Sequence, residues 1–197
     1  ALSSAASDVY KRQAMTLAVS VTACGGNAKD ETTEDETAGK TAVNILEDVW
    51  AAYEEDEKFA VVGGDYENMV DNAPGSVDVS DSETLDNLLG FPADSAEQID
   101  EGASMMHMMN QNTFTAGAYH LSNPKHLEKT ADALKENILD RQWMCGFPDK
   151  LVIYSVGSSF VAAAFGAEEM IDSFEEHLTE SYQSAVLLYD EDLTFSE

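Results

Sequence analysis

The sequence predicts an α+β domain in which an antiparallel sheet carries helices on one face. Three short runs, at 113–121, 151–156 and 160–165, are rich in the aliphatic, aromatic and small residues of buried strands. A segment with apolar residues at helical spacing separates the first two runs, and another follows the third. This order matches the split β-α-β, ferredoxin-like pattern from about residue 113 onward.

The first predicted helix covers 43–57. Its apolar residues recur at the i, i+3, i+4 spacing of one helix face. They are Val43, Leu46, Val49, Trp50 and Tyr53. Thr41 can cap the start of this helix. Acidic residues crowd its C-terminal end, where the helix dipole disfavours negative charge, so we expect the last turn to fray.

The segment that follows, up to residue 112, is predicted to hold only short elements. Glycines, prolines and acidic residues interrupt each of its apolar runs after a few positions. The elements expected here are a strand at 59–62, a loop at 71–81, a short helix at 81–89 and a strand at 104–110.

The best-defined helix is predicted from Asn123-Pro124 to about Trp143. Proline is tolerated at the first position of a helix, where its missing N–H costs no hydrogen bond. Leu127, Leu134 and Ile138 belong to the apolar stripe, whereas lysines and acidic residues alternate on the polar side. We therefore expect an ion-paired, solvent-facing surface and one buried face.

The C-terminal part is predicted to form a hairpin, a helix and an edge strand. The runs at 151–156 and 160–165 are separated only by Gly157-Ser158-Ser159, which favours a tight turn between antiparallel strands. A helix is expected from Ala167, with an edge strand at 186–189 after it.

The charge of the chain is strongly one-sided, with 38 acidic and 10 basic residues and a net charge of −28. Nucleic acid is excluded as a partner, because phosphate binding needs clustered Lys and Arg. Electrostatic attachment to anionic lipid is disfavoured for the same reason. Solubility and self-repulsion explain such a charge, and a saline habitat is a second explanation.

Residues 14–23 form an apolar run that is too short for a membrane span, which needs about 20 residues. It fits the apolar middle of a secretory signal peptide. Val21-Thr22-Ala23-Cys24 resembles the lipobox of bacterial lipoproteins. The resemblance implies cleavage before Cys24 and a diacylglyceryl group on its sulfur, and two acyl chains suffice for stable anchoring. The expected location is the outer face of the cytoplasmic membrane.

Residues 3–13, SSAASDVYKRQ, resemble a translated sequencing-adapter remnant. Lys11 and Arg12 then only imitate the basic start of a signal peptide, and the signal peptide is truncated in this sequence. The predicted organisation has four parts. They are 1–23, the artefact with the truncated signal; 24–41, an acidic disordered tether; 42–190, a single α+β domain; and 191–197, a loose acidic tail.

This arrangement resembles small uncharacterised lipoproteins of gut Firmicutes. The matching features are Cys24, the tether at 25–41, the strand and helix at 113–143 and the hairpin at 151–165. The resemblance lies in the pattern and spans most of the chain after Cys24. It implies an anchored single domain and carries no catalytic residue over to this sequence.

The most unusual local feature is the run from Met105 to Met109, which reads Met-Met-His-Met-Met. On a strand, Met105, His107 and Met109 share one face, and thioether and imidazole ligands together select Cu(I). Core packing by methionine is the ordinary alternative. A surface for a peptide or an apolar ligand is a third interpretation. These three residues are the candidate ligand or metal site.

No catalytic residues and no cofactor are predicted. The four histidines lack zinc-binding spacing, and Ser158 and Ser159 lie in a predicted hairpin without the Gly-x-Ser-x-Gly pattern. Cys145 lies in an apolar setting that favours a buried, unreactive thiol. The sequence therefore predicts a non-enzymatic, membrane-anchored binding or accessory module with a cell-surface protein partner. The alternative is a copper-binding or small-ligand-binding protein that uses the Met105–Met109 face.

Overall fold

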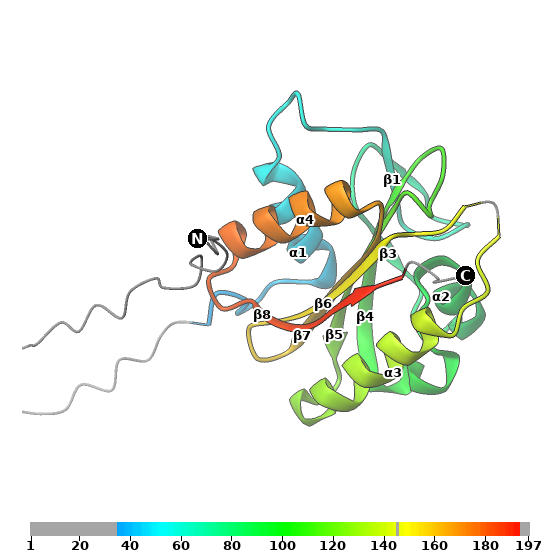
Figure 1. Cartoon of the computed structure of the whole chain (residues 1–197). Helices are drawn as coiled ribbons and strands as arrows, with labels where there is room; N and C mark the ends of the chain where they lie inside the picture. Colours follow the sequence, from blue (N-terminus) through cyan, green and yellow to red (C-terminus); the bar gives the residue numbers. More distant parts are fainter. Residues whose placement is uncertain (1–34, 145, 194–197) are drawn as a thin grey trace, which may run out of the picture. The chain divides into compact units, whose positions relative to one another are not determined.

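The computed structural model describes residues 35–144 and 146–193 (Figure 1). Cys24, Cys145 and the adapter-like stretch lie outside these residues, so the predictions about them stay predictions. None of the helices in the described ranges is long and apolar enough to cross a bilayer.

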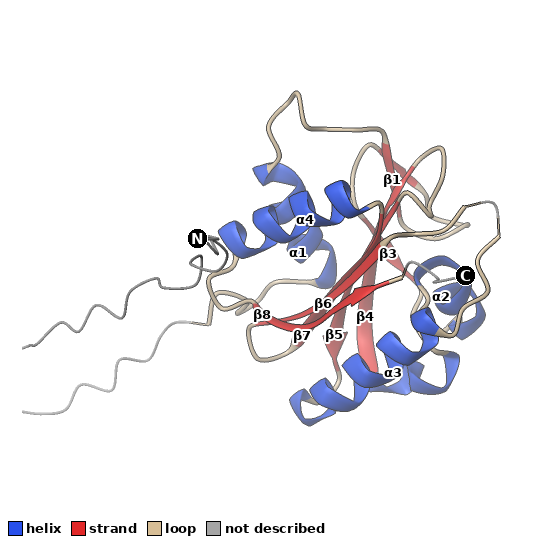
Figure 2. Ribbon diagram, viewed as in Figure 1, coloured by secondary structure: helices blue, strands red, loops and turns tan. Residues whose placement is uncertain are grey.

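Four α-helices and eight strands make up the described part of the chain (Figure 2). The helices are α1 (Ala42–Ala52), α2 (Ser82–Leu89), α3 (Leu127–Leu139) and α4 (Glu168–Ser181), with 3-10 helices η1 (Ala93–Gln98) and η2 (Pro124–His126). The strands are β1 (Val61–Gly63), β2 (Val70–Asp71), β3 (Gly75–Val77), β4 (Ile99–His107), β5 (Phe114–Leu121), β6 (Lys150–Val156), β7 (Phe160–Gly166) and β8 (Val186–Asp192).

All eight strands join one antiparallel sheet in the order β2-β1-β4-β5-β7-β6-β8, and β3 also pairs with β4. The predicted α+β class with an antiparallel sheet is confirmed. The hairpin of β6 and β7 is confirmed as well, with Val156 opposite Phe160 at its tight end.

The helices pack on both faces of the sheet, whereas one face was predicted. Helices α1 and α4 form one core with the sheet, which includes Val49, Met105 and Phe174. Helices α2 and α3 form a second core on the other face, which includes Leu85 and Leu134. Figure 1 shows the sheet lying between these two helix pairs.

The position of β8 explains this difference. Strand β7 lies between β5 and β6, so β5-α3-β6 is the predicted split β-α-β unit. A ferredoxin-like sheet would place β8 beside β5, but β4 already occupies that edge, and β8 pairs with β6 instead. The crossovers β5-α3-β6 and β7-α4-β8 then both move two positions along the sheet towards β8, but they start from strands that run in opposite directions. Two crossovers of the same hand must therefore lie on opposite faces.

Helix α1 begins as its sequence suggests but ends earlier than predicted. The backbone N–H of Asn44 donates to Thr41 Oγ1 at 3.3 Å, and Thr41 N–H donates to Asn44 Oδ1 at 3.1 Å, which makes a capping box. The helix ends at Ala52, five residues before the predicted end at 57. The acidic residues beyond it form a turn, in which Glu57 N–H donates to Glu54 O. Residues 53–57, predicted as the last turn of the helix, therefore lie outside it.

Other boundaries differ because the sequence signal there is weak. Strand β4 begins at Ile99, five residues earlier than expected, because Asp100 and Glu101 obscure its apolar pattern. It ends at His107, three residues before the predicted end. Strand β3 lies inside the predicted loop at 71–81, and helix α3 ends at Leu139 instead of Trp143.

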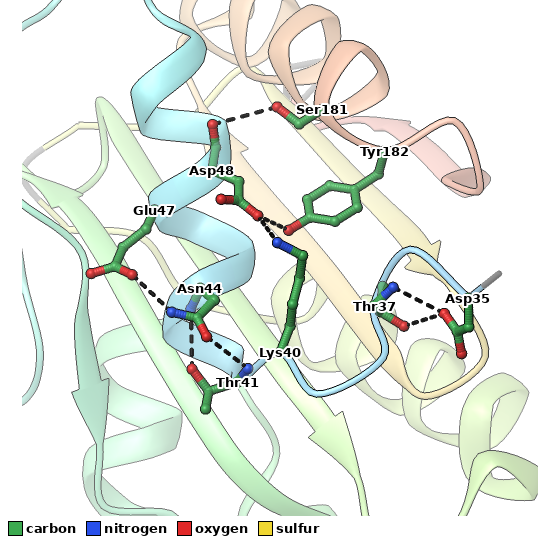
Figure 3. A network of polar contacts seen from close by, with 9 residues as sticks. All are labelled: Asp35, Thr37, Lys40, Thr41, Asn44, Glu47, Asp48, Ser181 and Tyr182. Carbon is green, nitrogen blue, oxygen red and sulfur yellow. Dashed lines mark hydrogen bonds and ion pairs between the residues drawn. The ribbon is translucent and has the colours of Figure 1, made fainter.

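Residues 35–41 pack against the domain, although a disordered tether was predicted to extend to 41. Thr37 is only 3% exposed, and Ser158 Oγ donates to Asp35 Oδ2 at 3.1 Å. Lys40 Nζ lies 2.5 Å from Asp48 Oδ2 on α1 (Figure 3). Side-chain hydrogen bonds and this ion pair hold the segment against the domain although its hydrophobicity is low.

The predicted loose tail at 191–197 is also shorter than expected. Strand β8 continues to Asp192, and Leu193 is buried. The backbone N–H of Leu193 donates to Asp149 O at 2.8 Å. Residues 194–197 lie outside the described ranges.

Candidate functional site

The run from Met105 to Met109 begins in the core and ends on the surface. Met105 is fully buried in the core formed with α1 and α4, and Met106 is buried in the opposite core. Strand β4 ends at His107, so Met108 and Met109 lie beyond it and are 45% and 83% exposed. The structure therefore places His107 Nδ1 3.1 Å from the backbone nitrogen of Met109, whereas Met105 is fully buried in the core.

A pocket of about 380 Å³ lies where β4 ends. Its lining consists of residues 62–66, Met69, Leu88 and 106–111, and we call it the methionine pocket. Four of the chain's eight methionines contribute to it: Met69, Met106, Met108 and Met109. Methionine side chains are flexible and polarisable, so such a lining adapts to apolar groups of different shapes. The volume lies within the range of small-ligand pockets.

Asp65 fixes the loop that carries Tyr66 and Met69. Its Oδ1 accepts hydrogen bonds from the backbone N–H of Glu67 at 3.1 Å and of Asn68 at 2.9 Å. Its Oδ2 accepts from the backbone N–H of Asp78 at 2.9 Å. Burial alone would raise the pKa of Asp65, but these hydrogen bonds together outweigh burial and hold the pKa below its ordinary value. Asp65 is thus an ionised structural group.

Glycine is required where this loop meets β1. A Cβ on Gly63 would lie 2.2 Å from Gly75 N, and Gly64 has a φ of +82°. Ser104 Oγ donates to Gly64 O at 2.7 Å from the neighbouring strand β4. The close approach of these backbones holds the wall of the methionine pocket in place.

His107 is held by backbone groups of the hairpin that follows it. Its Nδ1 lies 3.1 Å from Met109 N and 3.4 Å from Asn110 N. Backbone N–H groups can only donate, so Nδ1 accepts and the proton of the neutral ring is on Nε2. The ring also stacks on Phe59, with 5.7 Å between centroids. In this tautomer His107 offers an N–H donor and no free nitrogen lone pair for a metal.

Exposed apolar side chains extend around the methionine pocket. We call them the apolar rim: Tyr66, Met69, Val70, Met108, Met109, Met144 and Phe147. Asn112 links the β4–β5 hairpin to the α3–β6 loop, because its Nδ2 donates to Met144 O and Gly146 O, both at 3.1 Å. In the described residues, the only other exposed large apolar side chains are Val186 and Leu187 on β8. Apolar groups concentrated in one place are typical of interaction sites.

The end of β4 that borders the methionine pocket and the segment at 35–37 lie at opposite ends of the central strands (Figure 1). The segment at 35–37 contacts Ser158, in the turn between β6 and β7. Leu121 N–H donates to Ser159 O, and Leu121 pairs with Ile99 at the start of β4. The pocket is at the other end of β4, eight residues on. At about 3.3 Å per residue, the two ends are about 26 Å apart.

The remaining predicted features do not form a second site. His120 pairs with Asp100 at 2.5 Å at the end of β4 remote from the pocket. Ser158 lies in a hairpin turn and donates to Asp35. Within residues 35–144 and 146–193, no three His, Cys, Asp or Glu side chains are grouped to hold a metal ion.

The sequence contained no signal for Tyr66, Met69 or Leu88 as neighbours of Met108. These residues come from separate segments that meet only because β1 pairs with β4 and α2 packs near its end. The sequence shows Met69 as a single methionine in a loop between glycines, but no local pattern indicates that it lies near Met108. No family model, curated protein or solved structure matches the chain.

Proposed function

We propose that this chain is a lipid-anchored extracytoplasmic lipoprotein whose methionine pocket binds an apolar segment of a cell-surface protein. The lipid on Cys24 holds it at the outer face of the cytoplasmic membrane, and the domain acts as a non-enzymatic binding module. The observation that carries the proposal is the concentration of four methionines and an apolar rim at one end of the sheet.

The geometry of the domain supports this role. The chain enters at the end of the sheet opposite to the pocket. A tether that joins the domain at Asp35 would therefore be attached at the end of the sheet remote from the pocket.

The polar groups of the pocket also favour binding over chemistry. The carboxylate of Asp65 accepts hydrogen bonds from three backbone N–H groups, and Nδ1 of His107 accepts from two. General acid–base catalysis needs such a group to be directed at a substrate. Here these groups stabilise the walls of the pocket instead.

Replacement of Cys24 tests the anchor. Cys24→Ala is expected to move the protein from the membrane fraction to the soluble fraction, because no acyl chain can then be attached. The melting curve of the domain should not change. Cys145→Ala is the matched control and should leave the protein in the membrane fraction. Membrane retention of Cys24→Ala would contradict the proposal.

Copper binding is a second candidate, favoured by the four thioethers that line one pocket. The ligands would be Met69, Met106, Met108 and Met109, without Met105. The double variant Met108→Leu with Met109→Leu keeps the pocket apolar but removes two soft ligands. Competition titration with a Cu(I) chelator should then show an affinity loss of at least about tenfold. Met105→Leu is the control, and unchanged affinity of the double variant would exclude this candidate.

A further inference from the structure

We infer that the partner segment of the methionine pocket is a basic amphipathic helix, with apolar side chains on one face and Lys or Arg on the other. This inference rests on the proposed function of the pocket as a binding site. Three features of the pocket support it: its apolar lining, the charge around it and the lack of a strand edge that a partner could extend.

The apolar face of such a helix fits the lining of the pocket. Met69 is 67% exposed, Met108 is 45% exposed and Met109 is 83% exposed, so these side chains are available to a partner. Tyr66 is 63% exposed and adds an aromatic surface beside them. Burying these side chains against apolar groups of a partner removes apolar area from water and is favourable.

The charge around the pocket selects a cationic partner. No Lys or Arg is found among the residues that line the pocket, whereas Asp65 is among them and the exposed Glu67 is on the same loop. Of the basic residues in the described ranges, Lys40, Lys58 and Lys150 are ion-paired with carboxylates. Arg141, in the loop that carries Met144 and Phe147, donates to the backbone carbonyls of Asp86 and Asn87. The whole chain carries a net charge of −28. An anionic surface of this kind accelerates the encounter with cations and repels acidic partners.

The sheet offers little edge for a partner strand at the pocket. Strand β4 pairs with β5 on one side and with β1 and β3 on the other. The edge strand nearest to the pocket, β2, has only two residues. Recognition must therefore come from side chains in a groove, which is the mode that proteins use for amphipathic helices.

Fluorescence anisotropy with labelled peptides and the full chain tests the inference. The probe is a Leu/Lys peptide of about 18 residues, or about five helical turns, with the leucines on one face. A peptide of the same composition in scrambled order removes the amphipathic face. A peptide with Gln in place of Lys keeps that face without charge.

The Leu/Lys helix is expected to bind at least about tenfold more tightly than either control peptide. Its affinity should fall as NaCl is raised to about 0.5 M, because salt screens the charge attraction. The double variant Met69→Gln with Met109→Gln should weaken binding by at least about tenfold, since it places polar amides at exposed positions of the rim. Leu187→Gln, at an apolar position on β8 that is 45% exposed, should bind as the unchanged chain does.

Three results would overturn the inference. Equal binding of the scrambled peptide would reduce the interaction to nonspecific charge attraction. The Gln peptide could instead bind as tightly as the Leu/Lys peptide and lose that binding in the Met69→Gln and Met109→Gln variant. The partner would then be neutral, and the proposed binding function would stand without the basic helix. If no peptide binds at the pocket, both the inference and the proposed binding function fail.

Discussion

Asp65 determines the shape of the pocket at the level of a single residue. Its two carboxylate oxygens accept hydrogen bonds from backbone N–H groups at both ends of the loop. These are the N–H groups of Glu67 and Asn68 on one side and of Asp78 on the other. An ionised carboxylate accepts such bonds more strongly than a neutral group does. The position of Tyr66 and Met69 in the pocket therefore depends on this one charge.

Asp65→Asn is expected to destabilise the domain by about 1–3 kcal/mol at pH 7. The new amide can accept through one oxygen only, so the N–H of Asp78 loses its partner. The lowered pKa of Asp65 gives the unchanged chain a stabilisation that is present above the unfolded pKa of about 4 and is lost as the pH falls through the folded pKa. The difference between the two proteins should therefore shrink towards pH 3.

Urea unfolding at pH 7 and at pH 3 measures this difference. Glu67→Gln removes a charge from an exposed position of the same loop and should have little effect at either pH. An Asp65→Asn variant as stable as the unchanged chain at pH 7 would show that the carboxylate does not hold the loop.

Sequence reasoning at the residue scale found His107 and Met109 but grouped them with Met105, which is buried in the core. Period-two alternation predicts which side chains share a face only while the strand continues, and β4 ends at His107. Met69 entered the pocket through the pairing of β1 with β4, which is a contact between distant segments. Local patterns hold no information on such contacts.

At the scale of elements, local signals predicted the helices better than the sheet. Thr41 capped α1 as expected, and Gly90 ended α2 in the left-handed conformation, with a φ of 65°. Helix caps act within one helical turn, so they can be predicted from neighbouring residues in the sequence. The face chosen by α4 depends instead on where β8 pairs, and that choice depends on β4 occupying the edge of β5. The prediction of helices on one face failed for this reason.

The segment at 35–41 is expected to behave as part of the domain. A chain that begins at residue 35 should be as stable as the full chain. A chain that begins at residue 42 loses the buried Thr37, the ion pair of Lys40 with Asp48 and the cap at Thr41. We expect it to be less stable by about 2 kcal/mol, of which the cap alone contributes about 1 kcal/mol. Chemical denaturation of the two chains measures the difference. Equal stability would contradict the prediction and show that residues 35–41 do not stabilise the domain.

At the scale of the whole molecule, the two ends of the sheet carry different structural features. The chain enters beside the turn between β6 and β7, and the methionine pocket lies at the other end of β4. The α+β class and the split β-α-β unit could be predicted from the order of apolar runs. The placement of the pocket and of the segment at 35–37 at opposite ends of the sheet could not be predicted, because it depends on which loops lie together in the folded sheet.

Site-specific photo-crosslinking in intact cells tests the central claim, that the methionine pocket is the surface that binds a cell-surface partner. A photoreactive phenylalanine analogue replaces Met109 in one protein and Leu187 in another; both positions are exposed, but Leu187 lies on β8, outside the rim. Crosslinking from position 109 to one extracytoplasmic protein, weakened by Met69→Gln and absent from position 187, is the predicted result. Equal crosslinking from both positions, or none from position 109, would contradict the account.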